Sequence, residues 1–102
     1  MKKRLALHEE LCGVLGSRNV YFQPPENLKM SYPCIVYKRS EDWIKHANDR
    51  RYIIKEGYDL TVISTDPDSE IPDDILEHFD YCKLDRPFVS DNLNHTTLRL
   101  YY

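Results

Sequence analysis

The sequence is poor in the residues from which nucleotide and redox sites are built. Three glycines in 102 residues are too few for a glycine-rich loop that cradles phosphates. The three cysteines, Cys12, Cys34 and Cys82, lie far apart, and no two of them form a C-x-x-C pair. We therefore expect reduced, mostly buried cysteines in a protein that works inside the cell that makes it, or in a particle assembled there.

Long apolar runs are also missing. The basic start MKKR imitates the first part of a signal peptide, but its apolar run, Leu5–Leu7, is followed at once by His8, Glu9 and Glu10. No stretch of the sequence is long and apolar enough to span a membrane. We therefore expect no membrane partner.

Motifs for catalysis and metal binding are scarce as well. The four histidines share no metal-ligand spacing, and no serine lies in a nucleophile-elbow context. His8 and Cys12 are four residues apart on an expected helix, but no third group is apparent to orient such a pair. The segment Asp66–Glu77 resembles a calcium loop, yet Ile71 stands where the loop needs glycine, so we interpret it as an acidic helix start. These patterns predict a non-enzyme with no cofactor and no metal.

Positive charge is low overall but unevenly placed. The chain has a formal net charge of −3 and a pI near 5.7, which does not favour nucleic acid as a partner. Residues 1–65 carry 11 basic and 8 acidic side chains, a net of +3, whereas residues 66–102 carry 3 and 9, a net of −6. Such a chain could stack head-to-tail with copies of itself, although chance also explains the asymmetry.

The residue that is abundant is tyrosine, with eight copies. Tyrosine is favoured both at protein–protein contacts and on strand faces. Several aromatic and apolar residues, Tyr21, Phe22, Leu28, Met30 and Tyr32, fall in the segment YFQPPENLKMSYPCIVYKR, which contains three prolines. A long loop that is this apolar is expected either to be a contact element or to fold back over the sheet.

Periodicity predicts two helices and four strands. Leu7, Leu11, Val14 and Leu15 define one face of a helix over Lys2–Leu15, with Gly16 as its C-cap. A second helix is expected after a cap at Asp68 or Ser69. The strands are expected from Pro33 to Ile44, from Arg50 or Arg51 to Ser64, over Lys83–Ser90 and over Thr96–Tyr102. Alternation places Tyr58, Leu60 and Val62 on one face of the second strand, and Leu98, Leu100 and Tyr102 on one face of the fourth. Gly57 suggests a bulge or bend in the second strand, and Pro87 an edge or a bend in the third. The order α-β-β-α-β-β predicts a single α+β domain over residues 1–102, with two helices on one face of a mostly antiparallel sheet.

The first two strands are expected to form a long protruding β-hairpin. Its distal half, around residues 40–55, mixes basic, acidic and aromatic side chains. Protein contact fits this mixture best, while a solvated surface and a nucleic-acid platform remain as alternatives.

This order of elements resembles the tail terminator (tail completion) proteins of long-tailed bacteriophages and their prophages. The resemblance covers nearly the whole chain and is most specific over PPENLKMSYPCIVYKR. It implies a virion protein, assembled in the bacterial host cytoplasm, that forms a ring, commonly of six copies, on the head-proximal end of the tail tube. Its implied partners are further copies of itself, the tail tube protein and a head-completion or connector protein, with DNA passing through the lumen.

The alternatives are another head–tail connector, such as a head-closure or neck protein, and a small nucleic-acid-binding α+β module. For the tail terminator reading, the proline-marked loop and the hairpin tip would make the subunit or partner contacts. The interface residues expected on this basis are Tyr21, Phe22, Leu28, Met30, Trp43, Lys45, Arg50, Arg51 and Tyr52.

Overall fold

The structure, a computed structural model, describes residues 2–47 and 50–102, with side chains for residues 4–42 and 55–102. Two helices and five strands follow one another along the chain, and the α+β class is confirmed. The elements are α1 (Lys2–Leu15), β1 (Val20–Phe22), β2 (Cys34–Ala47), β3 (Arg50–Ser64), α2 (Ile71–His78), β4 (Cys82–Ser90) and β5 (Leu93–Tyr101).

The predicted order of elements is wrong by one strand, β1. It pairs in parallel with β2, Val20 opposite Ile35 and Phe22 opposite Tyr37, so the sheet is mixed. The strand order is β1-β2-β3-β5-β4, with antiparallel pairing everywhere else. A strand of three residues beside a proline-rich loop is too short to produce a period-2 pattern, which explains why the sequence did not reveal it.

Helix α1 has the predicted bounds. Leu7 and Leu11, four residues apart, lie on one face and are fully buried. Gly16 adopts φ +82°, and its N–H donates to the carbonyl oxygen of Cys12 at 2.9 Å, which ends the helix as expected.

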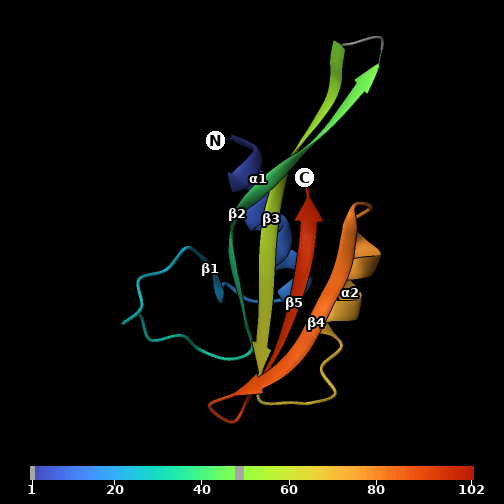
Figure 1. Cartoon of the computed structure of the whole chain (residues 1–102). Helices are drawn as coiled ribbons and strands as arrows, with labels where there is room; N and C mark the ends of the chain where they lie inside the picture. Colours follow the sequence, from blue (N-terminus) through green and yellow to red (C-terminus); the bar gives the residue numbers. More distant parts are fainter. Residues whose placement is uncertain (1, 48–49) are drawn as a thin grey trace.

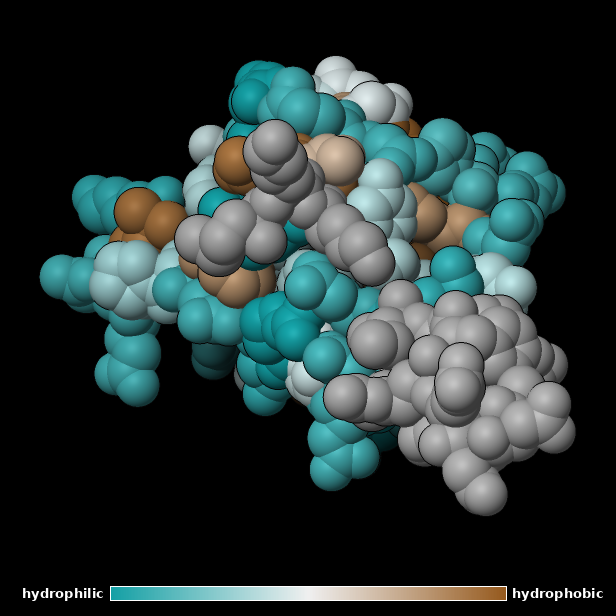
Figure 2. Space-filling model, turned by 90° about the horizontal axis from the view of Figure 1, so that it is seen from above, coloured by the Kyte–Doolittle hydropathy of each residue, from teal (hydrophilic) through white to brown (hydrophobic). Residues whose placement is uncertain are grey.

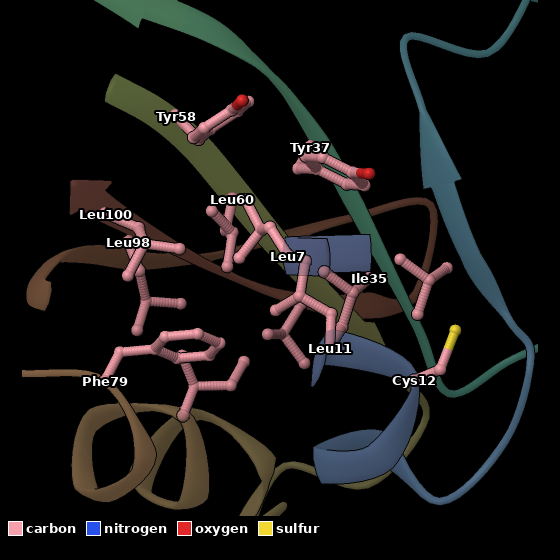
Figure 3. Close-up of a cluster of buried hydrophobic side chains, with 13 residues drawn as sticks. Leu7, Leu11, Cys12, Ile35, Tyr37, Tyr58, Leu60, Phe79, Leu98 and Leu100 are labelled. Atoms are coloured by element: carbon pink, nitrogen blue, oxygen red, sulfur yellow. The ribbon is translucent and has the colours of Figure 1, made fainter. Parts of the chain in front are cut away.

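Both helices cover the same face of the sheet (Figure 1). Their apolar faces meet the side chains of β2, β3 and β5 in a single core (Figure 3). The core comprises Leu7, Leu11, Cys12, Val20, Ile35, Tyr37, Tyr58, Leu60, Val62, Ile75, Phe79, Leu98 and Leu100. The predicted inward faces of β3 and β5 are thus confirmed, and burial of this apolar area is the main force holding the two layers together.

Helix α2 begins slightly later than predicted. The hydroxyl oxygen of Ser69 accepts from the N–H of Ile71 at 3.3 Å, while Glu70 occupies the cap position without a side-chain bond. Pro72 lies in the first turn, where its missing N–H costs nothing. Ile75 and Phe79 then point into the core.

Strand β4 forms one edge of the sheet, which agrees with the prediction from Pro87. Asp91 and Asn92, with φ of 52° and 61°, connect it to β5 by a tight turn. Because only these two residues turn, β5 begins at Leu93, three residues before the predicted start.

The surface seen from above is mostly hydrophilic, with small separate hydrophobic areas (Figure 2). In the part of the chain that the structure describes, neither helix is long and apolar enough to cross a membrane.

Candidate interaction site

The loop over residues 23–33 leaves β1, swings away from the sheet and returns to β2 (Figure 1). The backbone N–H of Gln23 donates to the carbonyl oxygen of Tyr37, and the Gln23 side-chain oxygen accepts from the N–H of Arg39. These two bonds tie the first residue of the loop to β2. The expected alternative, a loop folded back over the sheet, does not match this path.

Two of the predicted contact residues shape the base of the loop. The hydroxyl of Tyr21 accepts from the backbone N–H of Ser31 at 3.3 Å, so Tyr21 braces one side of the loop against the other. The centroid of the Phe22 ring lies 4.9 Å from that of Tyr37 and 4.4 Å from the Arg4 guanidinium. Phe22 is therefore half-buried against the core, and its role as a contact stays a prediction.

The outer part of the loop carries the exposed apolar residues. Leu28 is 40% exposed and Tyr32 is 41% exposed, while Met30 is half-buried. Pro24, Pro25 and Pro33 restrict the backbone on both sides of them, so that ordering the loop on a partner would cost little entropy. Leu28 and Met30 were predicted here, and Tyr32 joins them as a candidate contact.

The distal halves of β2 and β3 pair only with each other. Their register runs from Cys34 opposite Ile63 to Ala47 opposite Arg50. β1 pairs with β2 as far as Tyr37. β5 pairs with β3 as far as Gly57, and Tyr102 exchanges two backbone hydrogen bonds with the next residue, Glu56. Within the described residues, both backbone edges beyond these points lack a neighbouring strand. Unpaired strand edges are templates for pairing with another chain.

Five predicted interface residues lie on these distal halves. Trp43 and Lys45 belong to β2, and Arg50, Arg51 and Tyr52 belong to β3. Their side chains fall outside the described residues, so their role as contacts stays a prediction.

A bulge separates the distal halves from the body of the sheet. The register shifts between Ser40 and Trp43, opposite the predicted irregularity at Gly57. A Cβ atom at Gly57 would clash with the carbonyl oxygen of Glu41, so only glycine allows the two backbones to approach this closely. The Asp42 carboxylate accepts from the N–H of Gly57 at 3.2 Å and from Arg39 at 2.7 Å, which fixes the bulge.

A polar cluster lies at the edge of the core beside this bulge. The Arg39 guanidinium forms ion pairs with Asp42 and Glu56 and lies 5.2 Å from the Tyr58 ring. The Tyr58 hydroxyl donates to Glu56 at 2.8 Å. Burial is the main cause that raises the pKa of Tyr58, so its hydroxyl stays a donor.

A second polar contact joins α1 to β2. Nδ1 of His8 lies 2.7 Å from the hydroxyl of Tyr37, which is 1% exposed. With a neutral imidazole, the hydroxyl donates to Nδ1 and accepts from Arg4. Burial, then the positive charges of Arg4 and Arg18, lower the pKa of His8, while burial raises that of Tyr37.

A third contact joins both helices to Tyr102, the residue that directly follows β5. The Tyr102 hydroxyl donates to the Glu10 carboxylate, whose other oxygen lies 3.0 Å from Nε2 of His78. The bond to Glu10 raises the pKa of Tyr102 to about 12, and the same bond lowers the pKa of Glu10. The donors and acceptors satisfy one another, so this cluster holds α1, α2 and the C-terminal residue together.

The cysteines and the acidic segment offer no reactive arrangement. All three cysteines are free, and burial raises the pKa of Cys34 and of Cys82 to about 11, which keeps both as thiols. The calcium-loop resemblance ends at Ile71, where α2 begins. Among the described side chains, those of residues 4–42 and 55–102, no group of three acidic, histidine or cysteine residues is placed to hold a metal ion.

The sequence did not reveal an exposed apolar patch on the edge strand. Tyr81, Leu84, Phe88 and Val89 are between 39% and 69% exposed, and β4 lies at the open side of the sheet. Pro87 suggested an edge or a bend in this strand, and the sheet order places β4 at an edge. The register places Leu84 opposite Leu98 on the helix-covered face and Phe88 opposite His95 on the other face. The edge strand thus presents exposed apolar side chains on both faces, and such side chains are enriched at protein contacts.

Comparison with known proteins adds no assignment: no family model, no curated protein and no solved structure matches this chain.

Proposed function

We propose that this chain is a tail terminator subunit of a long-tailed bacteriophage or prophage. Copies of it would form a ring of about six on the head-proximal end of the tail tube, end tube polymerisation and join the tail to the head connector. DNA would pass through the lumen, and the action would be steric, with no covalent chemistry. Other head–tail connector proteins are close variants that differ in the neighbour they bind.

The observation that carries this proposal is the pair of free edges on the distal halves of β2 and β3. An isolated two-stranded hairpin is marginally stable in water, and three or more strands with a covered face are needed for independent stability. A hairpin that protrudes from the body as an arm would gain those neighbours by docking on another subunit or on the tail tube. The elongated shape, 50 × 24 × 23 Å, is consistent with such an arm.

The exposed loop residues support the same proposal. Leu28 and Tyr32 lie on a segment that prolines pre-organise, and Tyr21 braces it from within. An apolar, pre-organised loop on one side of the domain and an apolar edge strand on the other provide two different contact surfaces. Two different surfaces are what a closed ring of identical subunits needs.

The test is native mass as a function of concentration, followed by capping of tail tubes. A species near 73 kDa, about six times the 12.2-kDa chain, is expected, together with tubes that stop elongating once the protein is added. Leu28→Asp should weaken both readouts. The matched control is Leu5→Asp, which changes an exposed leucine of α1 away from the loop.

A protein that neither assembles nor binds tail tubes would overturn the proposal. Tube binding without capping would instead identify another connector of the tail or neck.

A further inference from the structure

The sheet has a second face, which no helix covers in the part of the chain that the structure describes. Along each strand alternate residues point to this face. Paired residues on neighbouring strands share a face, so the register places Lys38, Asp59, Arg99 and Lys83 in one row across β2, β3, β5 and β4. Both helices lie on the other side of the sheet (Figure 1).

This row forms the floor of a shallow groove. The groove has a volume of about 340 Å³ and is also lined by Thr61, Asp85 and Thr97. Arg99 and Asp59 neutralise each other through an ion pair of 2.6 Å. The Asp85 carboxylate accepts from the hydroxyl of Thr97 at 3.1 Å.

The lysines at the two ends of the row have no such partner. Lys38 and Lys83 are exposed, and neither forms an ion pair with another described residue. Three strand spacings of about 4.8 Å place them roughly 14 Å apart. Arg86, next to the groove, lies 5.6 Å from the ring of Phe88. The groove is thus lined by three basic and two acidic side chains, a small positive excess in a chain whose net charge is negative.

The segment that contains α2, on the other layer of the domain, carries the opposite charge. Residues 66–80 contain seven acidic side chains and no lysine or arginine. All seven are exposed, and none forms an ion pair within the described part of the chain. Because Ile75 and Phe79 bind α2 to the core, Asp73, Asp74 and Glu77 point away from the sheet.

We propose that the uncovered sheet face of one copy binds the acidic α2 surface of a second copy. The two surfaces lie on opposite layers of the domain. A two-fold dimer cannot bring both into contact at once, so this contact is heterologous and continues from subunit to subunit until it closes. Unpaired lysines on one surface and unpaired carboxylates on the other give charge complementarity and fix the register. This inference rests on the proposed ring and adds a charged contact between neighbouring subunits to the apolar contacts of the loop and of β4.

Charge exchange between the two surfaces tests the contact. One variant carries Lys38→Glu and Lys83→Glu, and a second carries Asp73→Lys and Asp74→Lys. Each alone should associate at least about tenfold more weakly than the unmodified chain, because like charges then face each other. An equimolar mixture of the two, and a chain with all four changes, should regain association. The four-change chain has the net charge of the natural sequence, so it controls for overall charge.

Sedimentation at low and moderate salt gives the readout, and urea unfolding of each variant checks that it is folded. Folded variants that assemble like the unmodified chain would overturn the inference and leave the ring intact. A mixture that does not associate, or an unmodified chain that stays monomeric at every concentration, would also overturn it. Single-stranded oligonucleotide binding that the two lysine changes abolish, with self-association unaffected, would assign the face to nucleic acid instead. Tube capping remains the separate test of the proposed function.

Discussion

On β3, Leu60 and Val62 point to the helices and are buried, whereas Asp59 and Thr61 alternate with them and line the opposite face. The same strand therefore serves two purposes. One face supplies the core, where packing sets stability. The other face supplies partly exposed polar and charged side chains that contribute little to folding.

The largest effect is expected from a change on the covered face. Leu60→Ala removes a side chain that is 0% exposed and should lower the free energy of unfolding by about 2–5 kcal/mol, because a cavity remains in the core. The control is Thr61→Ala at the next residue, which points to the other face. This change should alter the free energy of unfolding by less than about 0.5 kcal/mol. Urea denaturation measures both. Equal losses would show that the two faces do not differ in packing.

The bulge that separates the body of the sheet from its distal part comes next. Gly57→Ala places a Cβ against the Glu41 carbonyl and should cost roughly 1–3 kcal/mol, because the two backbones must move apart. Gly13→Ala is the matched control, since a Cβ at Gly13 meets nothing within 4 Å and alanine favours the helix. That control should stabilise the protein by about 0.5–1 kcal/mol. Thermal unfolding of both variants would settle the comparison, and a neutral Gly57→Ala would argue against the close approach.

The contact between His8 and Tyr37 predicts that the free energy of unfolding depends on pH. The pKa of His8 is lowered in the folded protein, so the unfolded chain binds more protons just below its ordinary value of 6.5. Stability should therefore fall as the pH drops from about 7 towards 5, and level off below the folded pKa.

His8→Gln should remove this part of the pH dependence, as measured by urea unfolding at several pH values. Tyr37→Phe should cost about 0.5–1.5 kcal/mol at pH 7, because it removes the hydroxyl that bonds His8. An unchanged pH profile in His8→Gln would assign the dependence to other groups, such as Glu10, which titrates at lower pH.

The smallest effect is expected on the uncovered face. Asp59→Asn breaks an ion pair with Arg99 whose side chains are each about one third exposed, so it should cost at most about 1 kcal/mol. Lys83→Ala, which breaks no ion pair in the described part of the chain, is its control and should be neutral for the monomer. If Lys83→Ala strongly lowered the free energy of unfolding of the monomer, the uncovered face would contribute to the stability of the fold.

Sequence reasoning recovered the elements with strong periodicity. Helix α1 and the inward faces of β3 and β5 follow from residues repeated at helix or strand spacing, as in Leu7 and Leu11. Gly57 was correctly identified as an irregular position. β1 was missed because a strand of three residues is too short to show an alternating pattern. α2 begins one residue later than a cap at Ser69 predicts, because Glu70 occupies the N-cap position although the Ser69 hydroxyl accepts from the N–H of Ile71.

The candidate site was less predictable. Leu28 and Met30 were found because prolines mark a loop that is too apolar for a plain linker. Phe22 was assigned to the same contact, yet it packs on Tyr37, and no local signal separates a loop aromatic from a core aromatic. The edge position of β4, and with it the exposure of Phe88 and Val89, depends on strand order, which is a property of the whole chain.

The sequence by itself determined which segments form helices and strands and which side chains of each are buried. It also determined how charge is distributed along the chain. All three depend on local residue spacing and composition. Tertiary structure alone decided which charges meet. Lys38, Asp59, Arg99 and Lys83 come from four different strands and form one row only because the sheet order and register bring them together. The position of each of these residues in its strand fixes the face to which its side chain points. The pairing between strands that are distant in the sequence decides which side chains become neighbours.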